Sequence, residues 1–265
     1  MIPAAFITEW QQTAPWQHPD MVEQDLVISR ALVELFSQDG IAQHLAFRGG
    51  TALYKLALLP AARYSEDIDL VQIDAEPIGA TIDHIHGVLD PWLGKPRYDT
   101  KDRSYRLAYR FTSEAGTPLR LKVEINTREH IGDTVTKPFS VNCRWFWGSA
   151  GITTFSLAEL LGTKLRALYQ RKKGRDLFDL DYALRHSEIE GSEVTAFFVR
   201  YLAAEGNHVS TSEFLDNLTR KCEDGQFCQD MTPLLRSGID FTVDEAVERV
   251  SSALVHHIDS AWERL

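Results

Sequence analysis

Two aspartates, Asp67 and Asp69, stand one residue apart in an apolar stretch and are the residues of this chain best suited to chemistry. Side chains alternate faces along a β-strand, so a strand here directs both carboxylates to one side, about 6.6 Å apart. Ile68 and Leu70 then point into the core. Two carboxylates this close in a partly dry setting repel each other unless a cation relieves the repulsion. Because Mg²⁺ commonly binds one or two carboxylates together with substrate phosphates, the pair predicts a magnesium site.

A glycine pair, Gly49 and Gly50, precedes the aspartates at a predicted strand-to-helix turn. Such a turn has no side chains to keep a phosphate away from its backbone N–H groups, and the hydroxyl of Thr51 can add a donor. The spacing fits neither a Walker loop, which ends in GKS or GKT, nor the dinucleotide fingerprint, which has a third glycine. We therefore expect a polyphosphate on the glycine turn, bridged by metal to Asp67 and Asp69.

A third carboxylate, that of Glu124, can complete a two-metal site. It belongs to PLRLKVEIN, residues 118–126, where apolar and polar residues alternate as in a half-buried strand. Lys122 shares the face of Glu124 and can neutralise phosphate charge. Each feature alone is an ordinary turn, strand end or strand face. Their combination indicates a site that binds metal ions and a polyphosphate.

The elements that must position these residues form a mixed α/β region. We predict helices at residues 21–36, 51–59 and 78–93, with Gly40 ending the first, and strands at 44–47, 67–73, 104–111, 118–126 and 152–155. The linker EAGTP fits a hairpin between the third and fourth strands. After Ser156, which fits a capping box with Glu159, helical periodicity continues to the end. The prediction is an α/β domain with a mixed sheet, residues 1–156, followed by a helical bundle, residues 157–265, packed against it.

Composition narrows the class of protein. Hydrophobic residues make up 44% and charged residues 25%, as in globular domains. No apolar run approaches the roughly 20 residues that span a bilayer, and the N-terminus MIPAAFITEWQQ lacks the pattern of a secretion signal. We therefore expect a cytoplasmic location and no membrane partner. Three cysteines, Cys143, Cys222 and Cys228, argue against a disulfide framework and predict ordinary thiols.

The charge distribution leaves two interpretations open. A net charge of −10 disfavours a general nucleic-acid coating protein. Residues 156–175, SLAELLGTKLRALYQRKKGR, nevertheless contain six Lys or Arg residues and one acid, which is +5 and leaves −15 for the remainder. Such a run is usually a solvated helix face, and it also offers a surface for the phosphates of an RNA.

The pattern hGGT…SxDhDh, in which h is apolar, resembles the nucleotidyltransferase superfamily that shares the polymerase-beta type catalytic fold. More narrowly, FRGGTALYKL…RYSEDIDL followed by KLRALYQRKKGRDLFDL resembles the AbiEii/MenT group of nucleotidyltransferase toxins, over about residues 47–180. The resemblance implies a mixed-sheet nucleotidyltransferase core that uses an NTP and Mg²⁺. It implies transfer of NMP to the 3′ end of tRNA, which inhibits translation and growth. It also implies a cognate antitoxin encoded nearby.

The resemblance assigns roles by position. Ser65 matches a serine that in some relatives contacts nucleotide phosphate or is phosphorylated to silence the toxin. Lys164 matches the lysine of the later motif, where it can reach a β- or γ-phosphate. Asp176 matches the acid of that motif's RD pair, although an acid in the first turn of a helix also fits capping. The phosphate turn, the metal carboxylates and the arginine of the RD pair are matched by Gly49, Gly50, Asp67, Asp69 and Arg175.

Two other functions fit the same residues. The acceptor can instead be a small molecule, such as an antibiotic, or a protein hydroxyl, and an acidic protein suits a cationic drug. Alternatively, a non-catalytic nucleotide-binding module acts through a protein partner. Just beyond the later motif, Asp179 and Asp181 are expected on a solvated helix face or bound to Arg175.

Overall fold

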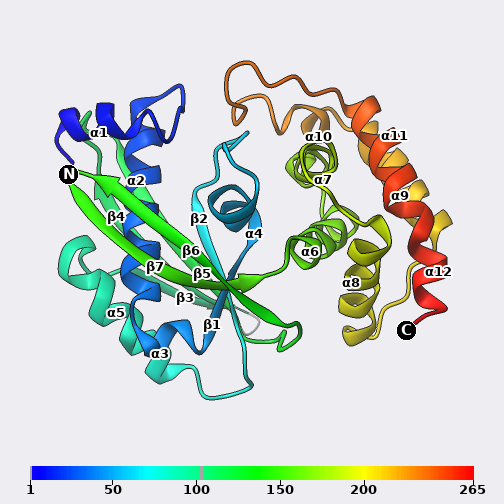
Figure 1. Ribbon diagram of the computed structural model, residues 1–265, viewed down its shortest axis with the longest axis horizontal. Helices are drawn as coiled ribbons and strands as arrows, with labels where there is room; N and C mark the ends of the chain where they lie inside the picture. Colours follow the sequence, from blue (N-terminus) through cyan, green and yellow to red (C-terminus); the bar gives the residue numbers. More distant parts are fainter. Residues whose placement is uncertain (1, 102–103) are drawn as a thin grey trace. The chain divides into compact units, whose positions relative to one another are not determined.

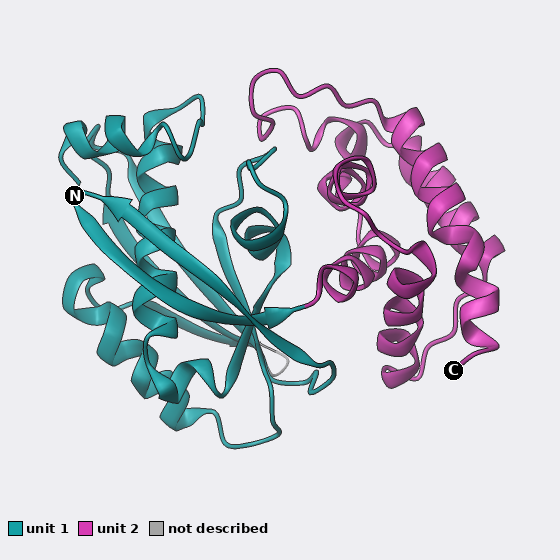
Figure 2. Cartoon of the chain, viewed as in Figure 1, with its two compact units in different colours: residues 1–155 teal, residues 156–265 magenta. Residues whose placement is uncertain are grey.

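The structure (Figure 1) is a computed structural model that describes residues 2–101 and 104–265. The chain divides into two compact units, Met1–Phe155 and Ser156–Leu265 (Figure 2). The first unit contains a β-sheet with helices packed on it, and the second is built from helices. The predicted fold class, a mixed-sheet α/β core followed by helices, is confirmed.

Seven strands make one mixed sheet in the first unit (Figure 1). They are β1 (Leu45–Arg48), β2 (Asp67–Gln72), β3 (Arg97–Lys101), β4 (Ser104–Thr112), β5 (Pro118–Asn126), β6 (Thr134–Cys143) and β7 (Phe146–Phe155). Their order across the sheet is β3-β4-β5-β2-β1-β7-β6. The neighbours β2 and β5 are parallel, as are β1 and β7, and the other pairs are antiparallel. Segments distant in the sequence, β2 and β5, therefore lie side by side at the centre.

The predicted hairpin of β4 and β5 has one buried and one polar face. Tyr109 and Leu121 are directly opposite each other, fully buried, and continue the apolar row of both strands. Helices α2 (Pro19–Phe36) and α5 (Gly79–Leu93) pack on the apolar side of the sheet (Figure 1). Because side chains alternate, the polar residues of β4 and β5 face the opposite side.

The glycine turn follows β1 directly. Helix α4 (Gly49–Ala52) continues into a single π-helical turn, η1 (Leu53–Ala57). The helix predicted at residues 51–59 therefore begins earlier, ends earlier and is partly π-helical. Such π-turns occur frequently at functional sites.

A buried carboxylate anchors η1 to α2. Asp25 accepts hydrogen bonds from the indole nitrogens of Trp10 and Trp16, at 2.8 and 3.1 Å. It also pairs with Lys55 Nζ at 2.6 Å, and Lys55 donates to Ser29 Oγ at 3.0 Å. Asp25 is 2% exposed, so the contacts of Lys55 fix the end of the glycine-turn helix against the core.

Three sequence predictions about the first unit are corrected. Strands β3 and β6 were not predicted, because β3 is short and polar and β6 is largely exposed and contains Pro138. Strand β7 is longer than the predicted segment at residues 152–155. Gly40 does not end the preceding helix: α2 stops at Phe36 with Ser37 as C-cap, and Gly40 lies inside α3 (Asp39–Ala42).

The second unit consists of short to medium helices. Ser156 caps the first of them, since its hydroxyl accepts a hydrogen bond from Glu159 N at 3.2 Å, as its sequence pattern predicts. Gly174 begins the second helix against Phe227, where an added Cβ would lie 2.1 Å from the Phe227 carbonyl oxygen. The elements are α6 (Leu157–Gln170), α7 (Gly174–His186), α8 (Gly191–Ala204), α9 (Thr211–Cys222), α10 (Gly225–Gln229), α11 (Val243–Ala253), η2 (Val255–His257) and α12 (Ile258–Trp262).

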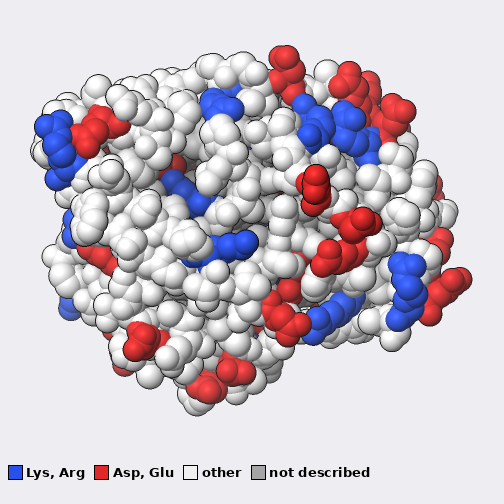
Figure 3. All heavy atoms as spheres, in the orientation of Figure 1, with Lys and Arg blue, Asp and Glu red and all other residues white. Residues whose placement is uncertain are grey.

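Two further expectations concern the whole chain. Across residues 2–101 and 104–265, we find no helix with the length and apolar character that crossing a membrane requires. Cys143, Cys222 and Cys228 are free thiols, as predicted. On the face drawn in Figure 3, acidic and basic side chains are interspersed in small clusters.

Replacing Asp25 with Ala should destabilise the first unit by about 3–5 kcal/mol, because the change leaves the Lys55 ammonium and two indole N–H groups without their buried acceptor. Denaturant unfolding followed by circular dichroism measures the loss. Asp83→Ala, on the exposed face of α5, is the matched control and should change stability by less than about 0.5 kcal/mol. Equal midpoints for the two variants would contradict the anchoring role.

Candidate active site

Strand β2 directs Asp67 and Asp69 to the polar face of the sheet. Ile68 and Leu70 alternate with them and are buried. The side chain of Asp67 is 30% exposed and Asp69 is half-buried. Both carboxylates are thus partly removed from water and still open to a ligand.

The parallel pairing of β2 with β5 brings further charged residues to this face. Asp67 is in register with Lys122, and Asp69 with Glu124. On the other side of β2, Arg48 at the end of β1 is opposite Asp69. Three carboxylates, two from β2 and one from β5, therefore occupy nearby positions of one sheet.

Two cations compensate two of the three carboxylates. Lys122 Nζ lies 2.7 Å from Asp67 Oδ2 and 3.5 Å from Glu124 Oε2. Arg106, opposite Glu124 on β4, holds that carboxylate with two hydrogen bonds of 3.1 and 3.2 Å. Asp69 makes no ion pair and accepts no hydrogen bond from the part of the chain that the structure describes. Its negative charge is the one left without a direct partner.

The pKa values of these groups follow from this arrangement. Burial and the charge of Asp67 raise the pKa of Asp69. Burial disfavours the charged form of Glu124, but its hydrogen bonds with Arg106 and the charge of Lys122 outweigh this and lower its pKa. Burial likewise opposes charge on Lys122, yet the hydrogen bond to Asp67 and the nearby carboxylates raise its pKa. Asp69 is thus the carboxylate that a cation would relieve most.

The backbone of the glycine turn lies close to the Asp69 carboxylate. Gly49 has a φ of +81°, and an added Cβ there would lie 2.3 Å from Asp69 Oδ2. A Cβ on Gly50 would lie 2.3 Å from Arg63 Nη2 and 3.1 Å from Ser65 Oγ. Any side chain at either position would therefore displace the groups around the carboxylates, and glycine lets the backbone approach them.

Thr51 and Ser65 lock the turn to β2. The Thr51 hydroxyl donates to the Asp67 carbonyl oxygen at 2.6 Å and lies 2.8 Å from Ser65 Oγ. Because Thr51 has a single hydroxyl proton, Ser65 must donate in the second bond. Thr51 is 1% exposed. In this arrangement Thr51 positions the turn, whereas the sequence had suggested that it donates to phosphate.

The residues of the later motif form a buried ion cluster in the second unit. Lys164 Nζ lies 3.0 Å from Asp176 Oδ1 and 2.9 Å from Asp179 Oδ2. Arg171 donates two hydrogen bonds to Asp176, at 2.7 and 2.8 Å. Burial disfavours the Asp176 carboxylate, yet the charges of Lys164 and Arg171 lower its pKa well below its usual range. Asp176 lies in the first turn of α7, where an acid also suits the helix dipole, and the side-chain hydrogen bonds it accepts come from Lys164 and Arg171.

The prediction for Asp179 and Asp181 is wrong. Both are buried, Asp179 with Lys164 and Asp181 between Arg185 and Arg249. Arg175 instead lies 3.9 Å from Asp230, which also accepts its backbone N–H. Sequence reasoning missed these pairings because they join helices distant in the chain.

The basic stretch at residues 156–175 has most of its charge compensated inside the second unit. Besides Lys164, Arg171 and Arg175, Arg166 pairs with Glu205 at 2.8 Å and Lys172 pairs with Asp224. Five of its six basic residues therefore contact carboxylates. The stretch is a weaker candidate for an RNA surface than its sequence suggested.

Besides Arg48, the sequence analysis missed two arginines near the site. Arg106 was detectable, because the hairpin register places it opposite Glu124. Arg63, 2% exposed, donates to the Tyr64 carbonyl oxygen at 2.9 Å and stacks over the ring of Tyr54. No spacing or motif marked Arg63, since its role depends on the loop that folds it back toward Gly50.

The carboxylates suit a hard cation. Within the described residues, no three His, Cys, Asp or Glu side chains converge into a ready metal site. Mg²⁺, however, usually takes one or two carboxylates and completes its shell with water and substrate phosphates. The uncompensated carboxylate of Asp69 beside Asp67 fits such an ion.

Comparison with known proteins decides the family. The family model described as the nucleotidyl transferase AbiEii toxin of type IV toxin–antitoxin systems matches residues 30–252. The chain belongs to the AbiEii nucleotidyltransferase toxin family. The enzyme class and the toxin group that the sequence motifs predicted are thereby confirmed. The AbiEii family assignment implies an NTP substrate, a divalent metal ion and an antitoxin partner.

Solved structures share the AbiEii fold of this chain. MenT4, a nucleotidyltransferase toxin from Mycobacterium tuberculosis, is 19% identical with a TM-score of 0.66, covering 100% of this chain and 93% of MenT4. JHP933 from Helicobacter pylori is 16% identical with a TM-score of 0.52, covering 92% of this chain and 94% of JHP933. No curated protein matches the sequence. At these identities the structures establish the fold.

Replacing Asp69 with Asn should raise the melting temperature of the metal-free protein at neutral pH. The folded state raises the pKa of Asp69, so its charged form costs stability above that pKa. The gain should vanish below about pH 3, where Asp69 is protonated in both the folded and unfolded chain. Asp67→Asn, which loses the ion pair with Lys122, is the matched control and should not gain stability. A lower melting temperature for Asp69→Asn at pH 7 would refute this account.

Proposed function

We propose that this AbiEii protein is a Mg²⁺-dependent nucleotidyltransferase that transfers NMP from an NTP to the 3′ end of tRNA and thereby inhibits translation and growth. The observation that carries the proposal is the set of three carboxylates on β2 and β5, in which Asp69 is in register with Glu124 and lies directly against the glycine turn. The MenT4 likeness in fold is consistent with it.

Different residues of the first unit are proposed to bind the metal and the triphosphate. Asp67 and Asp69 hold the metal, and Gly49 and Gly50 present backbone N–H groups to the triphosphate. When bound, Mg²⁺ supplies charge neutralisation for the phosphates. Glu124, kept anionic by its lowered pKa, would be the third carboxylate of a two-metal site.

The acceptor hydroxyl must lose its proton as its oxygen attacks the α-phosphate and pyrophosphate leaves. Glu124, or one of the two aspartates, would take that proton. Lys122, which pairs with Asp67 at 2.7 Å, is the cation that would neutralise phosphate charge.

The remaining assignments rest on the family motif. Lys164 and Asp176 are proposed as catalytic residues, with Arg175 and Ser65 as substrate-binding residues. Residues 1–156 are proposed as the nucleotidyltransferase domain and residues 157–265 as the helical domain. The substrates imply action in the cytoplasm, where a cognate antitoxin controls the toxin.

Incubation with tRNA, Mg²⁺ and each labelled NTP should transfer label to RNA. Asp67→Ala should reduce the rate by about a hundredfold or more, because losing a metal ligand removes several kcal/mol of charge stabilisation. Asp133→Ala, an exposed acid of the same unit, is the control and should keep full activity. Undiminished incorporation by Asp67→Ala would contradict the assignment of Asp67 to the active site. If the label is instead found only in small molecules or protein, tRNA is not the acceptor and one of those is.

Expression of the chain without its antitoxin should arrest growth, and the double variant Asp67→Ala, Asp69→Ala should not, because toxicity requires catalysis. Colony counts after induction measure the effect, with immunoblots confirming equal protein levels. Toxicity that survives the double substitution would favour the non-catalytic partner protein instead.

A further inference from the structure

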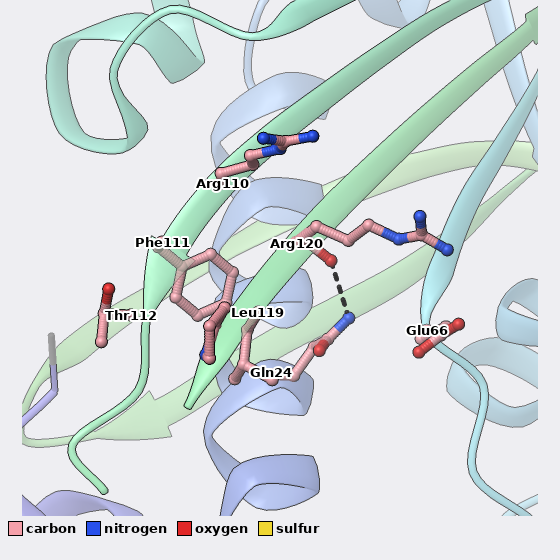
Figure 4. Close-up of a pocket in the computed structure, with 8 residues that line it drawn as sticks. Gln24, Glu66, Arg110, Phe111, Thr112, Leu119 and Arg120 are labelled. Atoms are coloured by element: carbon pink, nitrogen blue, oxygen red, sulfur yellow. Dashed lines mark hydrogen bonds between the residues drawn. The ribbon is translucent and has the colours of Figure 1, made fainter. Parts of the chain in front are cut away.

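Two arginines stand directly opposite each other on the polar face of the hairpin. Arg110 on β4 is in register with Arg120 on β5, and both are exposed. They line a cavity of about 480 Å³ together with Gln24, Glu66 and the end of the hairpin (Figure 4). In Figure 4 the Arg120 guanidinium extends toward the segment of Glu66.

This arrangement is electrostatically unfavourable in the free protein. Like charges at directly opposed positions of antiparallel strands destabilise a sheet. Neither guanidinium makes an ion pair with any carboxylate in the part of the chain that is described, Glu66 included. By contrast, the nearby cations Arg106 and Lys122 each contact Glu124. Both guanidinium groups are therefore available to bind an anion.

The strand register relates this pair to the candidate active site. Arg120, Lys122 and Glu124 are alternate residues of β5 and share its polar face, with neighbours about 6.8 Å apart. Gln24 Nε2 donates to the Arg120 carbonyl oxygen at 2.9 Å, which ties this part of β5 to α2. Along β5, Arg120 is thus about 7 Å from Lys122 and about 14 Å from Glu124, a span of one or two nucleotides.

The pair also lies on a particular side of the carboxylates. In the sheet order β4-β5-β2-β1, the glycine turn follows β1 on one side of β2, and the arginines lie on β4 and β5 on the other. Phosphoryl transfer places the attacking and leaving oxygens roughly in line. With the triphosphate at the glycine turn, the attacking acceptor approaches from the side of the arginines.

We propose that Arg110 and Arg120 bind phosphodiester groups of the RNA acceptor strand and lead its 3′ end to Asp67 and Asp69. Guanidinium groups hold phosphates through two parallel, charge-assisted hydrogen bonds. Such contacts position a nucleic acid without reading its sequence. This inference rests on the proposed function, and it explains how a chain of net charge −10 holds a polyanion.

The test compares Arg110→Gln, Arg120→Gln with the wild-type protein and with the control double variant Lys95→Gln, Lys137→Gln. The control removes the same two charges from exposed positions of the first unit. Fluorescence anisotropy of labelled tRNA, titrated at several salt concentrations, measures binding without catalysis. Steady-state transfer assays give KM for RNA and for NTP separately.

The arginine variant should raise KM for RNA about tenfold or more and leave KM for NTP unchanged. Its plot of log affinity against log salt should be less steep by about 1.4–1.8, or 0.7–0.9 for each lost phosphate contact. Its melting temperature should equal or exceed that of wild type, since a like-charge repulsion is removed. The control should match wild type in KM.

Three results would overturn the inference. These are unchanged RNA affinity and salt slope in the arginine variant, a loss confined to KM for NTP, and wild-type protein that binds no RNA. Failure of the proposed function would give a different result from failure of this inference. Wild-type protein would then bind tRNA through these arginines in the anisotropy titration and would transfer no nucleotide to it.

Discussion

Repulsion between closely spaced carboxylates is the constraint on which the candidate active site depends. Asp67, Asp69 and Glu124 occupy adjacent positions of β2 and β5, and only two cations, Lys122 and Arg106, contact them directly among the described residues. The unmatched charge remains on Asp69, whose pKa is raised by burial and by Asp67. The folded chain therefore keeps an unfavourable, unpaired negative charge at Asp69, and a bound cation would stabilise the chain most at this position.

The neighbouring backbone is shaped by that same carboxylate. Gly49 can lie against Asp69 only because it has no side chain and tolerates a positive φ. A hydrogen bond from Thr51 holds the turn to the backbone of β2. From behind, Asp25 fixes Lys55 at the end of the same short helix. A turn that must approach a charge closely is therefore held from two sides and cannot relax away from it.

Sequence reasoning succeeded where the signal is local. The alternation in β4 and β5 gave their apolar faces, and the DxD spacing gave a shared face for Asp67 and Asp69. Sequence reasoning failed for features that depend on which strands pair in the folded sheet. The edge strands β3 and β6 bury few apolar side chains and so leave little pattern. The bond between Lys122 and Asp67 depends on the parallel register of two strands some fifty residues apart, which no local spacing encodes.

The second unit shows why a charge run is poor evidence for a binding surface. Residues 156–175 look strongly basic in the sequence, yet the buried Asp176 of α7 and more exposed acids of distant segments pair with most of those charges. Arg110 and Arg120 look unremarkable, being two arginines on separate strands, and pairing of β4 with β5 brings them together without a carboxylate. An anion interacts with the basic residues that have no ion pair inside the protein. Candidate anion-binding residues are therefore found by leaving out of the count every Lys or Arg that pairs with a carboxylate. In the first unit, Arg110 and Arg120 on the polar face of the hairpin are among the cations that then remain.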